Sequence, residues 1–421
     1  MSYRVLLHSV IGGVIMKDTY IIHAKKIVTV SEKGTIENGA MIVQDGKIAG
    51  IIERNFSKKL YPTIPVLDYT DYVITPSLVD CHTHLLEFAP NSLYPVTKET
   101  QLHAGRAILM KVLMAGITAI GEQVCGHPQS AFSIDDYRAA CAGLPIDISF
   151  AATSISIGFE ELAHFTSITQ SRAVCKADLI NAYIIHQMAK NSDYPGENLF
   201  LNATPANFTA EVVPRAGELI YTRKELQQIV RTFHHVKKQI GVHVAGEEGI
   251  DMALDTGVDV LHHAHGITKE QLEKASRLGV KVIATPLGGT HLKPNSPEDV
   301  VELMDDEIET SIATDAYLPP YPNVDWLPFE AGGLQGPDVL MKISNPSMKL
   351  LKEKGYNEND ILALITANPA KVLGKGNRFG KLQRGMDANF IVAEGIPGLE
   401  MVEVEGIRKV FFRGKMVVER G

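Results

Sequence analysis

Cysteine is scarce in this chain, and the few cysteines present show no pairing pattern. None of the four forms a CxxC spacing, and all lie in apolar surroundings: Cys81, Cys125, Cys141 and Cys175. Small secreted domains held by disulfides have dense, regularly spaced cysteines, so such a scaffold is excluded. Reduced thiols are typical of a cytoplasmic protein, which is the location that we predict.

Clustered positive charge is also missing. The chain has 41 Lys and Arg against 49 Asp and Glu, a formal net charge of −8, and its basic residues form no stripe. A protein that binds nucleic acid needs such a stripe to neutralise phosphates. Nucleic acid is therefore not an expected partner.

Long apolar runs are absent as well. The apolar stretch behind Arg4 is too short to span a bilayer and lacks a small-x-small cleavage site. We therefore expect no membrane partner. Met16 begins a strand-like segment, so residues 1–15 are predicted to be an N-terminal extension that is either disordered or packed at a subunit contact.

The two ends of the chain share a β-rich pattern. Of the 421 residues, 45% are hydrophobic and 21% charged, which is typical of a globular protein with a large core. The segments "DGK" at 45–47 and "RGK" at 413–415 are hairpin turns between apolar runs. Each end alone is too short to bury a core, so we predict one composite β-sandwich domain from residues 16–74 and 376–421.

Residues 75–375 alternate strand-like and helix-like segments. Eight such units predict an α/β protein whose parallel strands close into a (β/α)8 TIM-like barrel. A doubly wound open sheet is the alternative, although no GxGxxG-type loop follows any strand. Ser296 is a typical helix N-cap, and Pro297 a typical first helical residue. The expected strands end at Asp80, Glu122, Thr153, Asn202, His243, His262, Thr285 and Asp315.

The strongest chemical signal is "VDCHTH", which puts His82 and His84 at the end of the first expected barrel strand. Residues two apart in a strand face the same side, so both imidazoles can reach one point. Two imidazoles bind a divalent ion when further ligands converge on it. In a barrel, those ligands come from the C-terminal ends of other strands.

Suitable donors stand at those places. His243 lies in "IGVHVAG", Asp315 lies in "SIATDA", and "DVLHHAHG" carries His262, His263 and His265. Imidazole and carboxylate ligands suit zinc, iron or manganese. The coincidence favours a metal site over several unrelated structural residues.

Longer motifs indicate a family. "VITPSLVDCHTHL" resembles the "PGxxDxHxH" first strand of the amidohydrolase superfamily, with Ser77 in place of the usual glycine. "LITANPAKVLG" and "GKLQRGMDANFIV" resemble its C-terminal motif. "HVAGEEGIDMALDTGVDVLHHAHG" is most similar to the branch with imidazolonepropionases and Xaa-Pro dipeptidases. The resemblance implies a metal-dependent hydrolase with a (β/α)8 barrel and a small β-sandwich built from both chain ends.

The resemblance also implies residue roles. It carries metal ligation onto four residues and a ligand or carbonyl-polarising role onto His263, which the family spacing selects in the sixth strand. The four implied metal ligands are His82, His84, His243 and Asp315.

The other two histidines of this segment, His262 and His265, are expected to have different positions from His263. His262 stands where the family usually has a glutamate, and strand alternation places it on the opposite side, behind the sheet. His265 is expected in the outgoing loop, near the pocket mouth.

The fourth strand departs from the family pattern. Dipeptidase-like relatives place there a lysine that becomes carboxylated and bridges two metals, whereas Asn202 stands at about that place here. An amide has no charge to share between two cations, so we predict one divalent ion, with zinc favoured over iron and manganese. Glu211 would substitute only if the alignment has slipped.

Four residues are weaker candidates, assigned here as substrate contacts. Glu122 ends the second strand, where a salt bridge is the more frequent role. His291 follows the seventh strand. The full set is Glu122, His265, His291 and Asn202.

The predicted reaction follows from these roles. A bound metal lowers the pKa of its water to about 7. Asp315 takes the proton as general base and returns it to the leaving nitrogen as general acid, while His263 stabilises the oxyanion. We predict a homo-oligomeric amidohydrolase that cleaves a C–N bond, other than a peptide bond, of a small molecule.

Three alternatives remain open at this point. A heterocycle deaminase would release ammonia, and a binuclear Xaa-Pro-type dipeptidase would need a bridging anion. A non-catalytic member would lack ligands, and none is missing from the sequence.

Overall fold

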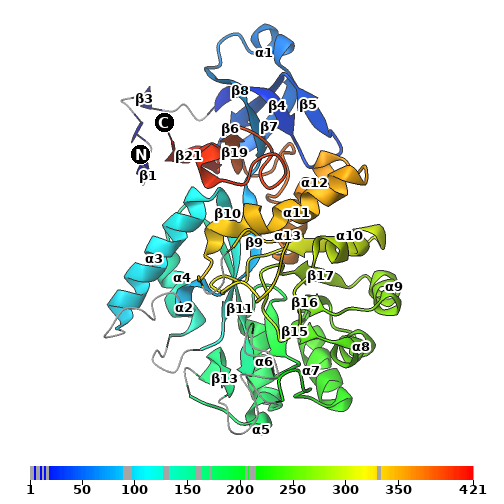
Figure 1. Cartoon of the computed structure of the whole chain (residues 1–421). Helices are drawn as coiled ribbons and strands as arrows, with labels where there is room; N and C mark the ends of the chain where they lie inside the picture. The colour runs from blue at the N-terminus through cyan, green and yellow to red at the C-terminus, as the bar shows by residue number, and fades with distance from the viewer. Residues whose placement is uncertain are drawn as a thin grey trace.

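A computed structural model describes residues 19–88, 97–126, 132–156, 164–169, 172–203, 207, 215–329 and 333–420, together with three two-residue strands before residue 19. The chain forms a small β-rich unit and a larger α/β unit, one at each end of the molecule (Figure 1).

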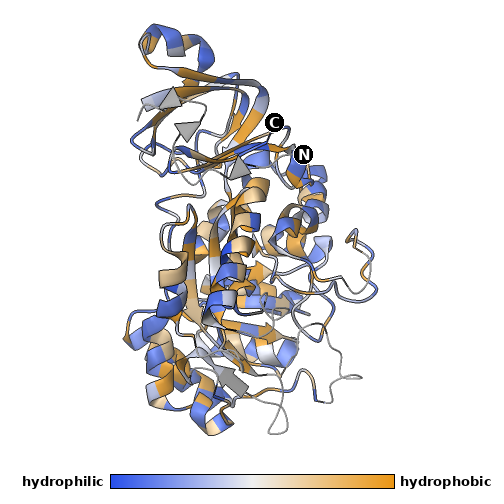
Figure 2. Ribbon diagram, turned by 90° about the vertical axis from the view of Figure 1, so that its left-hand side faces the viewer, coloured by the Kyte–Doolittle hydropathy of each residue, from blue (hydrophilic) through white to orange (hydrophobic). Residues whose placement is uncertain are grey.

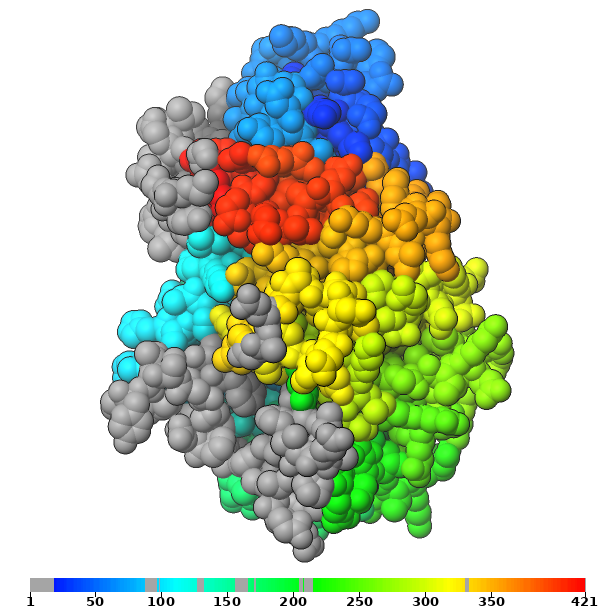
Figure 3. All heavy atoms as spheres, in the orientation of Figure 1, coloured from blue at the N-terminus to red at the C-terminus, as the bar shows by residue number. Residues whose placement is uncertain are grey.

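Both chain ends contribute to the sheet of the β-rich unit. Strand β8 pairs in parallel with β4 and antiparallel with β19, which joins the N-terminal segment to the C-terminal one. The blue and red segments accordingly lie against each other in the space-filling view (Figure 3). The strand order is β1-β21-β20-β19-β8-β4-β6-β7, with β5 beside β4.

The β-rich unit also includes the short helix α1. In the core of this unit the rings of Phe390 and Phe411 stack, with their centroids 4.3 Å apart. Within residues 1–15, β2 pairs with β3, and β1 pairs with β21 of the same chain. The bounds are β1 Arg4–Val5, β2 Val10–Ile11, β3 Val14–Ile15, β4 Thr19–Val28, β5 Thr35–Glu37, β6 Gly39–Gln44, β7 Lys47–Glu53, α1 Arg54–Leu60, β8 Val66–Pro76, β19 Phe390–Ala393, β20 Ile407–Phe412 and β21 Lys415–Glu419.

Both expected hairpin turns form as predicted. The pairs 45–46 and 413–414 are two-residue loops between paired strands. All four residues have positive φ, from 48° to 75°. A type I′ turn needs positive φ at both central residues, which aspartate and glycine accept readily.

The larger unit is α/β, with parallel strands in two sheets. One sheet has the order β11-β10-β9, and the other runs β14-β15-β16-β17-β18. The strands are β9 Leu78–Thr83, β10 Ile117–Val124, β11 Asp147–Ala152, β14 Glu197–Phe200, β15 Gly241–Ala245, β16 Val260–His265, β17 Lys281–Ala284 and β18 Thr310–Ile312, and β12 Ser154–Ser156 pairs with β13 His164–Thr166 outside these sheets.

Every strand expected from the sequence has a counterpart here. The observed ends lie within three residues of the predicted ones, the largest differences being at β9, β16 and β18. The coarse prediction of an α/β fold with parallel strands is therefore confirmed.

The two sheets meet at both pairs of edges. Beyond β18, Asp315 N donates to His82 O at 3.1 Å, and Ala316 O accepts from His84 N at 2.8 Å. Between the edges formed by β11 and β14, the side chain of Asn198 donates to Ala152 O at 2.8 Å. The bonds beyond β18 hold the C-terminal ends of β9 and β18 together, where three of the expected metal ligands stand: His82, His84 and Asp315.

Helices cover the strands on the outside, and their hydrophobic faces turn inward (Figure 2). Ser296 caps α10 in a capping box, with Pro297 as its first residue, as predicted. The helices are α2 Leu85–Phe88, α3 Lys98–Met114, α4 Ile134–Cys141, α5 Lys176–Leu179, α6 Ala182–Asn191, α7 Arg223–His235, α8 Glu247–Thr256, α9 Lys269–Leu278, α10 Pro297–Asp305, α11 Leu340–Glu353, α12 Glu358–Ala363 and α13 Ala367–Val372. None of the helices in the described residues has the length and apolar character needed to cross a membrane.

Candidate metal centre

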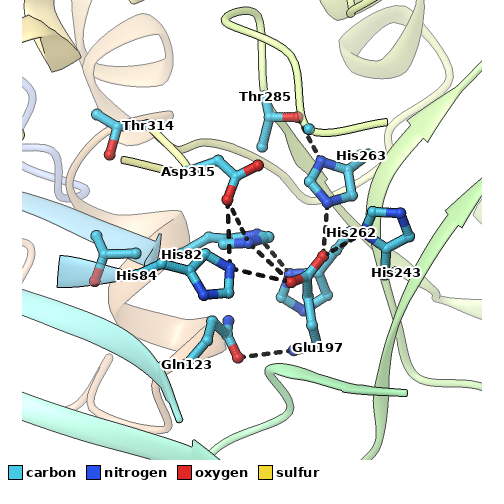
Figure 4. Close-up of polar contacts among 12 residues, drawn as sticks. His82, His84, Gln123, Glu197, His243, His262, His263, Thr285, Thr314 and Asp315 are labelled. Carbon is cyan, nitrogen blue, oxygen red and sulfur yellow. Dashed lines mark hydrogen bonds and ion pairs between the residues drawn. The ribbon is translucent and has the colours of Figure 1, made fainter. Parts of the chain in front are cut away.

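Six acidic and histidine side chains converge in one cluster inside the α/β unit (Figure 4). Five of them are the residues that the sequence predicted: His82, His84, His243, His263 and Asp315. The sixth is Glu197, the first residue of β14. All six lie in the interior, and the side chain of His84 is the most exposed, at 12%.

Glu197 lies at the centre of the cluster. Its Oε1 is 2.7 Å from His243 Nδ1 and 2.6 Å from His263 Nε2. Its Oε2 is 3.3 Å from the Nε2 atoms of both His82 and His84. One carboxylate thus faces two pairs of imidazoles, one with each oxygen.

Asp315 completes the side of the cluster that contains His82 and His84. Its Oδ1 lies 3.2 Å from His82 Nε2 and 3.4 Å from His84 Nε2. Two nitrogen or oxygen ligands of one tetrahedral ion are about 3.4 Å apart, so these separations match a shared ion. The donor atoms form two groups that could each hold an ion, His82 with Glu197 and His263, and His82 with His84 and Asp315.

His82 provides an independent test of this fit. Its Nε2 is buried and makes no well-aligned hydrogen bond among the described residues, although oxygens of Asp315 and Glu197 lie 3.2 and 3.3 Å away. Buried polar atoms are normally satisfied, so an orphan aimed at two carboxylates indicates a missing partner. A cation at this point would satisfy it, and the residues present therefore fit a divalent metal.

The electrostatics of the cluster are strongly coupled. Burial would raise the pKa of Glu197, but the imidazoles of His82 and His243 outweigh it and hold that pKa well below its usual range. Burial would lower the pKa of His82, but the carboxylates of Glu197 and Asp315 raise it to about 10. Without a metal, the protein therefore balances its buried carboxylates with protonated imidazole.

Asn202 is not at the centre, so the prediction that it occupies the bridging place is wrong. Its Nδ2 donates to Gly217 O at 2.7 Å, and its Oδ1 accepts from Ala245 N at 2.8 Å. Both groups of the amide are thus used to join neighbouring segments. Glu211, the other acidic residue considered there, lies outside the described residues.

A suitable carboxylate, Glu197, stands in the fourth strand of the sequence, but at its start and not at its end. Alignment with the family directs attention to the end of β14, whereas Glu197 begins it. The backbone at Gly196 runs so close to Gln123 that an added Cβ would lie 2.4 Å from Gln123 Oε1. Gln123 Oε1 also accepts from Glu197 N at 3.0 Å, which anchors this carboxylate where the strand enters the sheet.

The sixth strand, β16, does not alternate as predicted. His263 and Ala264 have φ values of 69° and 50°, so the chain leaves the extended conformation there. His262, expected behind the sheet, lies on the same side as Val260 and faces the cluster instead, with its Nδ1 2.9 Å from His82 Nδ1. His263 still reaches Glu197, as the family spacing indicated.

His265 is buried at the end of β16 rather than in an outgoing loop. Its Nδ1 is 2.8 Å from Thr290 Oγ1, and its Nε2 is 3.2 Å from Thr285 Oγ1. Thr285 Oγ1 also lies 2.7 Å from His263 Nδ1. His265 therefore contacts Thr285, the residue next to His263, through Nε2, and its Nδ1 is occupied by Thr290.

Glu122 neither forms an ion pair among the described residues nor faces the cluster. Its carboxylate accepts from Thr83 Oγ1 at 2.7 Å and from the backbone N–H groups of Leu85 and Leu86 at 3.2 and 2.7 Å. Burial raises its pKa to about 7. The expected salt bridge is wrong, because this carboxylate instead holds the turn that follows His84.

His291, half-buried, lies against Gly217, where an added Cβ would be 2.4 Å from its Nε2. Gly289 lies much closer to the cluster. A Cβ there would be 2.4 Å from His263 Cε1 and 2.5 Å from Asp315 Oδ2, and its φ is 119°. Only glycine fits between these two side chains, so Gly289 forms one wall of the centre.

Comparison with known proteins decides the family, because the model of the amidohydrolase family matches residues 73–417. The chain belongs to the amidohydrolase family. It is therefore a metal-dependent hydrolase, and the family predicted from the sequence is confirmed.

Relatives of this amidohydrolase agree with the branch inferred from its motifs. It is 22% identical to the imidazolonepropionase of Shouchella clausii over 434 residues, which cover 93% of this chain and 88% of that protein. A shorter match, to the imidazolonepropionase of Brucella anthropi, is 39% identical over 74 residues, 17% of this chain and 18% of that one. The solved structure of a Xaa-Pro dipeptidase with bound methionine shares the fold at a TM-score of 0.71 and 16% identity, covering 94% of this chain and 99% of that one.

Proposed function

We propose that this amidohydrolase cleaves a C–N bond of a small molecule, an amide or a cyclic amide, at a centre that holds two divalent ions bridged by Glu197. The observation that carries the proposal is the position of Glu197, with one oxygen toward His82 and His84 and the other toward His243 and His263. A carboxylate supplies the charge between two cations that an amide at position 202 would lack. We infer also that the two parallel sheets together form a (β/α)8 barrel.

In this proposal the ligands divide into two groups. His82, His84, Asp315 and Glu197 would hold the first ion, and His243, His263 and Glu197 would hold the second. Imidazole and carboxylate donors suit zinc, with iron and manganese as alternatives. When bound, the metal supplies an acidified water and polarises the scissile carbonyl.

Asp315 is the residue that moves the proton. Its Oδ1 faces His82 and His84, whereas its Oδ2 lies beside Gly289, on the wall of the centre. Oδ2 can therefore accept a proton as general base and return it to the leaving nitrogen as general acid.

Metal analysis tests the bridged centre. Plasma emission of the purified protein is expected to give two ions per chain, and Glu197→Gln is expected to lose at least one of them. The matched control is Asn202→Ala, which removes the side chain of the rejected position and should keep both ions. One ion per chain, unchanged in Glu197→Gln, would contradict the bridge.

A substrate screen tests the reaction. The metal-loaded protein is assayed on cyclic ureides, N-acyl amides, dipeptides and aminated heterocycles, with Asp315→Asn as the control. Full activity in that variant would refute the role of Asp315. Ammonia release from a heterocycle would assign a deaminase instead.

A second candidate is a dipeptidase of the Xaa-Pro type. It is favoured by the same position of Glu197, because a bridging anion was the feature that this alternative required. Turnover of dipeptides in preference to cyclic amides would decide for it.

A further inference from the structure

The role predicted for His262 of β16, a place behind the sheet, does not explain its position. His262 is fully buried, and its ring meets that of His82 edge-on with centroids 4.8 Å apart. Its two ring nitrogens have one contact each. Nδ1 lies 2.9 Å from His82 Nδ1, and Nε2 lies 3.1 Å from Pro195 O.

The carbonyl fixes the direction of this chain of hydrogen bonds. A carbonyl oxygen can only accept, so His262 Nε2 must carry the proton that it donates to Pro195. A neutral imidazole then has a bare Nδ1, which accepts from His82 Nδ1–H. In the neutral form that binds a metal, His82 in turn has a bare Nε2, the atom that points at Glu197 and Asp315.

The reverse arrangement would not serve a metal. If His262 carried a proton on Nδ1, then His82 Nδ1 would have to accept it, and His82 would carry its own proton on Nε2. That proton would point at the place of the ion and compete with it.

The backbone around His262 is built to allow the contact with Pro195. A Cβ on Gly241 would lie 2.7 Å from His262 Nε2 and 2.5 Å from Pro195 O. Pro195 stands two residues before Glu197, so His262 connects the segment that carries Glu197 to the ring of His82. One buried side chain thus orients two members of the centre.

We propose that His262 is a positioning residue that fixes the tautomer of His82 and so presents His82 Nε2 to the metal, by way of the hydrogen-bond chain from Pro195. This rests on the metal centre of the proposed function. His262 does not touch the substrate or the ion.

Two substitutions separate the two contacts of His262. An asparagine places its Oδ1 near the position of Nδ1, so His262→Asn keeps an acceptor for His82 and loses the bond to Pro195. A glutamine places its amide near the position of Nε2, so His262→Gln keeps a donor for Pro195 and loses the acceptor for His82. If the role is to fix His82, asparagine rescues and glutamine does not.

The readout is zinc affinity, measured by titrating Zn²⁺ into chelator-stripped protein in competition with a chromogenic chelator. We expect His262→Gln to weaken zinc binding at the site that contains His82 by about 10- to 100-fold, the usual effect of losing the hydrogen-bond partner of a metal ligand. The zinc affinity of His262→Asn should stay within about threefold of wild type. His23→Asn is the control, because His23 is also buried but lies in the β-rich unit, with Nε2 2.8 Å from Ser57 Oγ. It should lower the melting temperature without changing zinc affinity.

The outcomes are distinct. Equal zinc affinity in wild type and His262→Gln, or equal loss in both His262 variants, would overturn the role of His262. Absence of zinc binding by the wild type would instead refute the proposed function. If His262→Gln does not fold, ¹⁵N-histidine spectra of the zinc-loaded wild type decide: a ring proton on Nε2 of His262 and one on Nδ1 of His82 support the proposal, and a proton on Nδ1 of His262 overturns it.

Discussion

Strands β9 and β16 both carry closely spaced histidines, yet they present them in different ways. At the end of β9 the backbone stays extended, and His82 in the strand and His84 just after it both point their Nε2 atoms at Glu197. In β16 the positive φ of His263 and Ala264 turns the chain, so three histidines at uneven spacing face the interior. Sequence spacing predicts the facing of a side chain only where the backbone keeps a regular conformation.

The largest expected effect comes from forcing His263 away from the centre. Gly289→Ala puts a Cβ into the space beside His263 Cε1 and Asp315 Oδ2, at a φ of 119° that other residues rarely adopt. We expect loss of metal and of hydrolysis, with a stability cost of about 1 to 3 kcal/mol from the backbone alone. Metal analysis and thermal unfolding measure both.

The control for this variant is Gly279→Ala. Gly279 has φ 68° at the end of α9, and nothing lies within 4 Å of its added Cβ. A side chain there also needs a positive φ, although a less strained one, and meets no clash, so this variant should keep its metal. Equal metal loss in both variants would show that strain, and not the position of Gly289, is responsible.

An intermediate effect is expected from the support behind His263. Thr285→Val keeps the shape but removes the hydroxyl that contacts His263 Nδ1 at 2.7 Å and His265 Nε2 at 3.2 Å. Metal affinity should fall by about tenfold, since the ring of His263 is no longer held. The control is Thr310→Val in β18, which loses only the hydrogen bond that the Thr310 hydroxyl donates to Ile308 O. It should leave metal affinity unchanged.

The smallest effect tests the backbone of β16 itself. Ala264→Gly removes a buried methyl group, worth about 0.8 kcal/mol, but relieves a left-handed conformation that costs an L-residue about 1 to 2 kcal/mol. The unfolding free energy should therefore stay within about 1 kcal/mol of wild type.

Ala284→Gly is the matched change in an extended strand, since Ala284 is also buried and ends β17. It gains no relief of strain and should cost about 1 to 2 kcal/mol. Equal losses in the two variants, measured by denaturant unfolding, would mean that β16 is not turned at Ala264.

Local pattern was enough for much of the fold. The hairpin turns at 45–46 and 413–414, the cap of α10 and all eight parallel strands follow from neighbouring residues, because turn chemistry and hydrophobic periodicity act over a few positions. Local pattern failed for Asn202 and Glu122. Both have the right residue type at the right place in the chain, but each has its polar atoms taken up by backbone groups that only the folded chain brings near.

The sequence by itself determined the family, the histidine pair of β9 and the identity of His243, His263 and Asp315 as members of one cluster. Only the tertiary structure decided that Glu197 is the central carboxylate and that His262 stands behind His82. The reason is physical: the close approach at Gly196 and Gly241 and the turned backbone of β16 are imposed by packing between strands distant in the sequence. These contacts set the direction of a side chain, whereas composition and spacing set only which side chain is available.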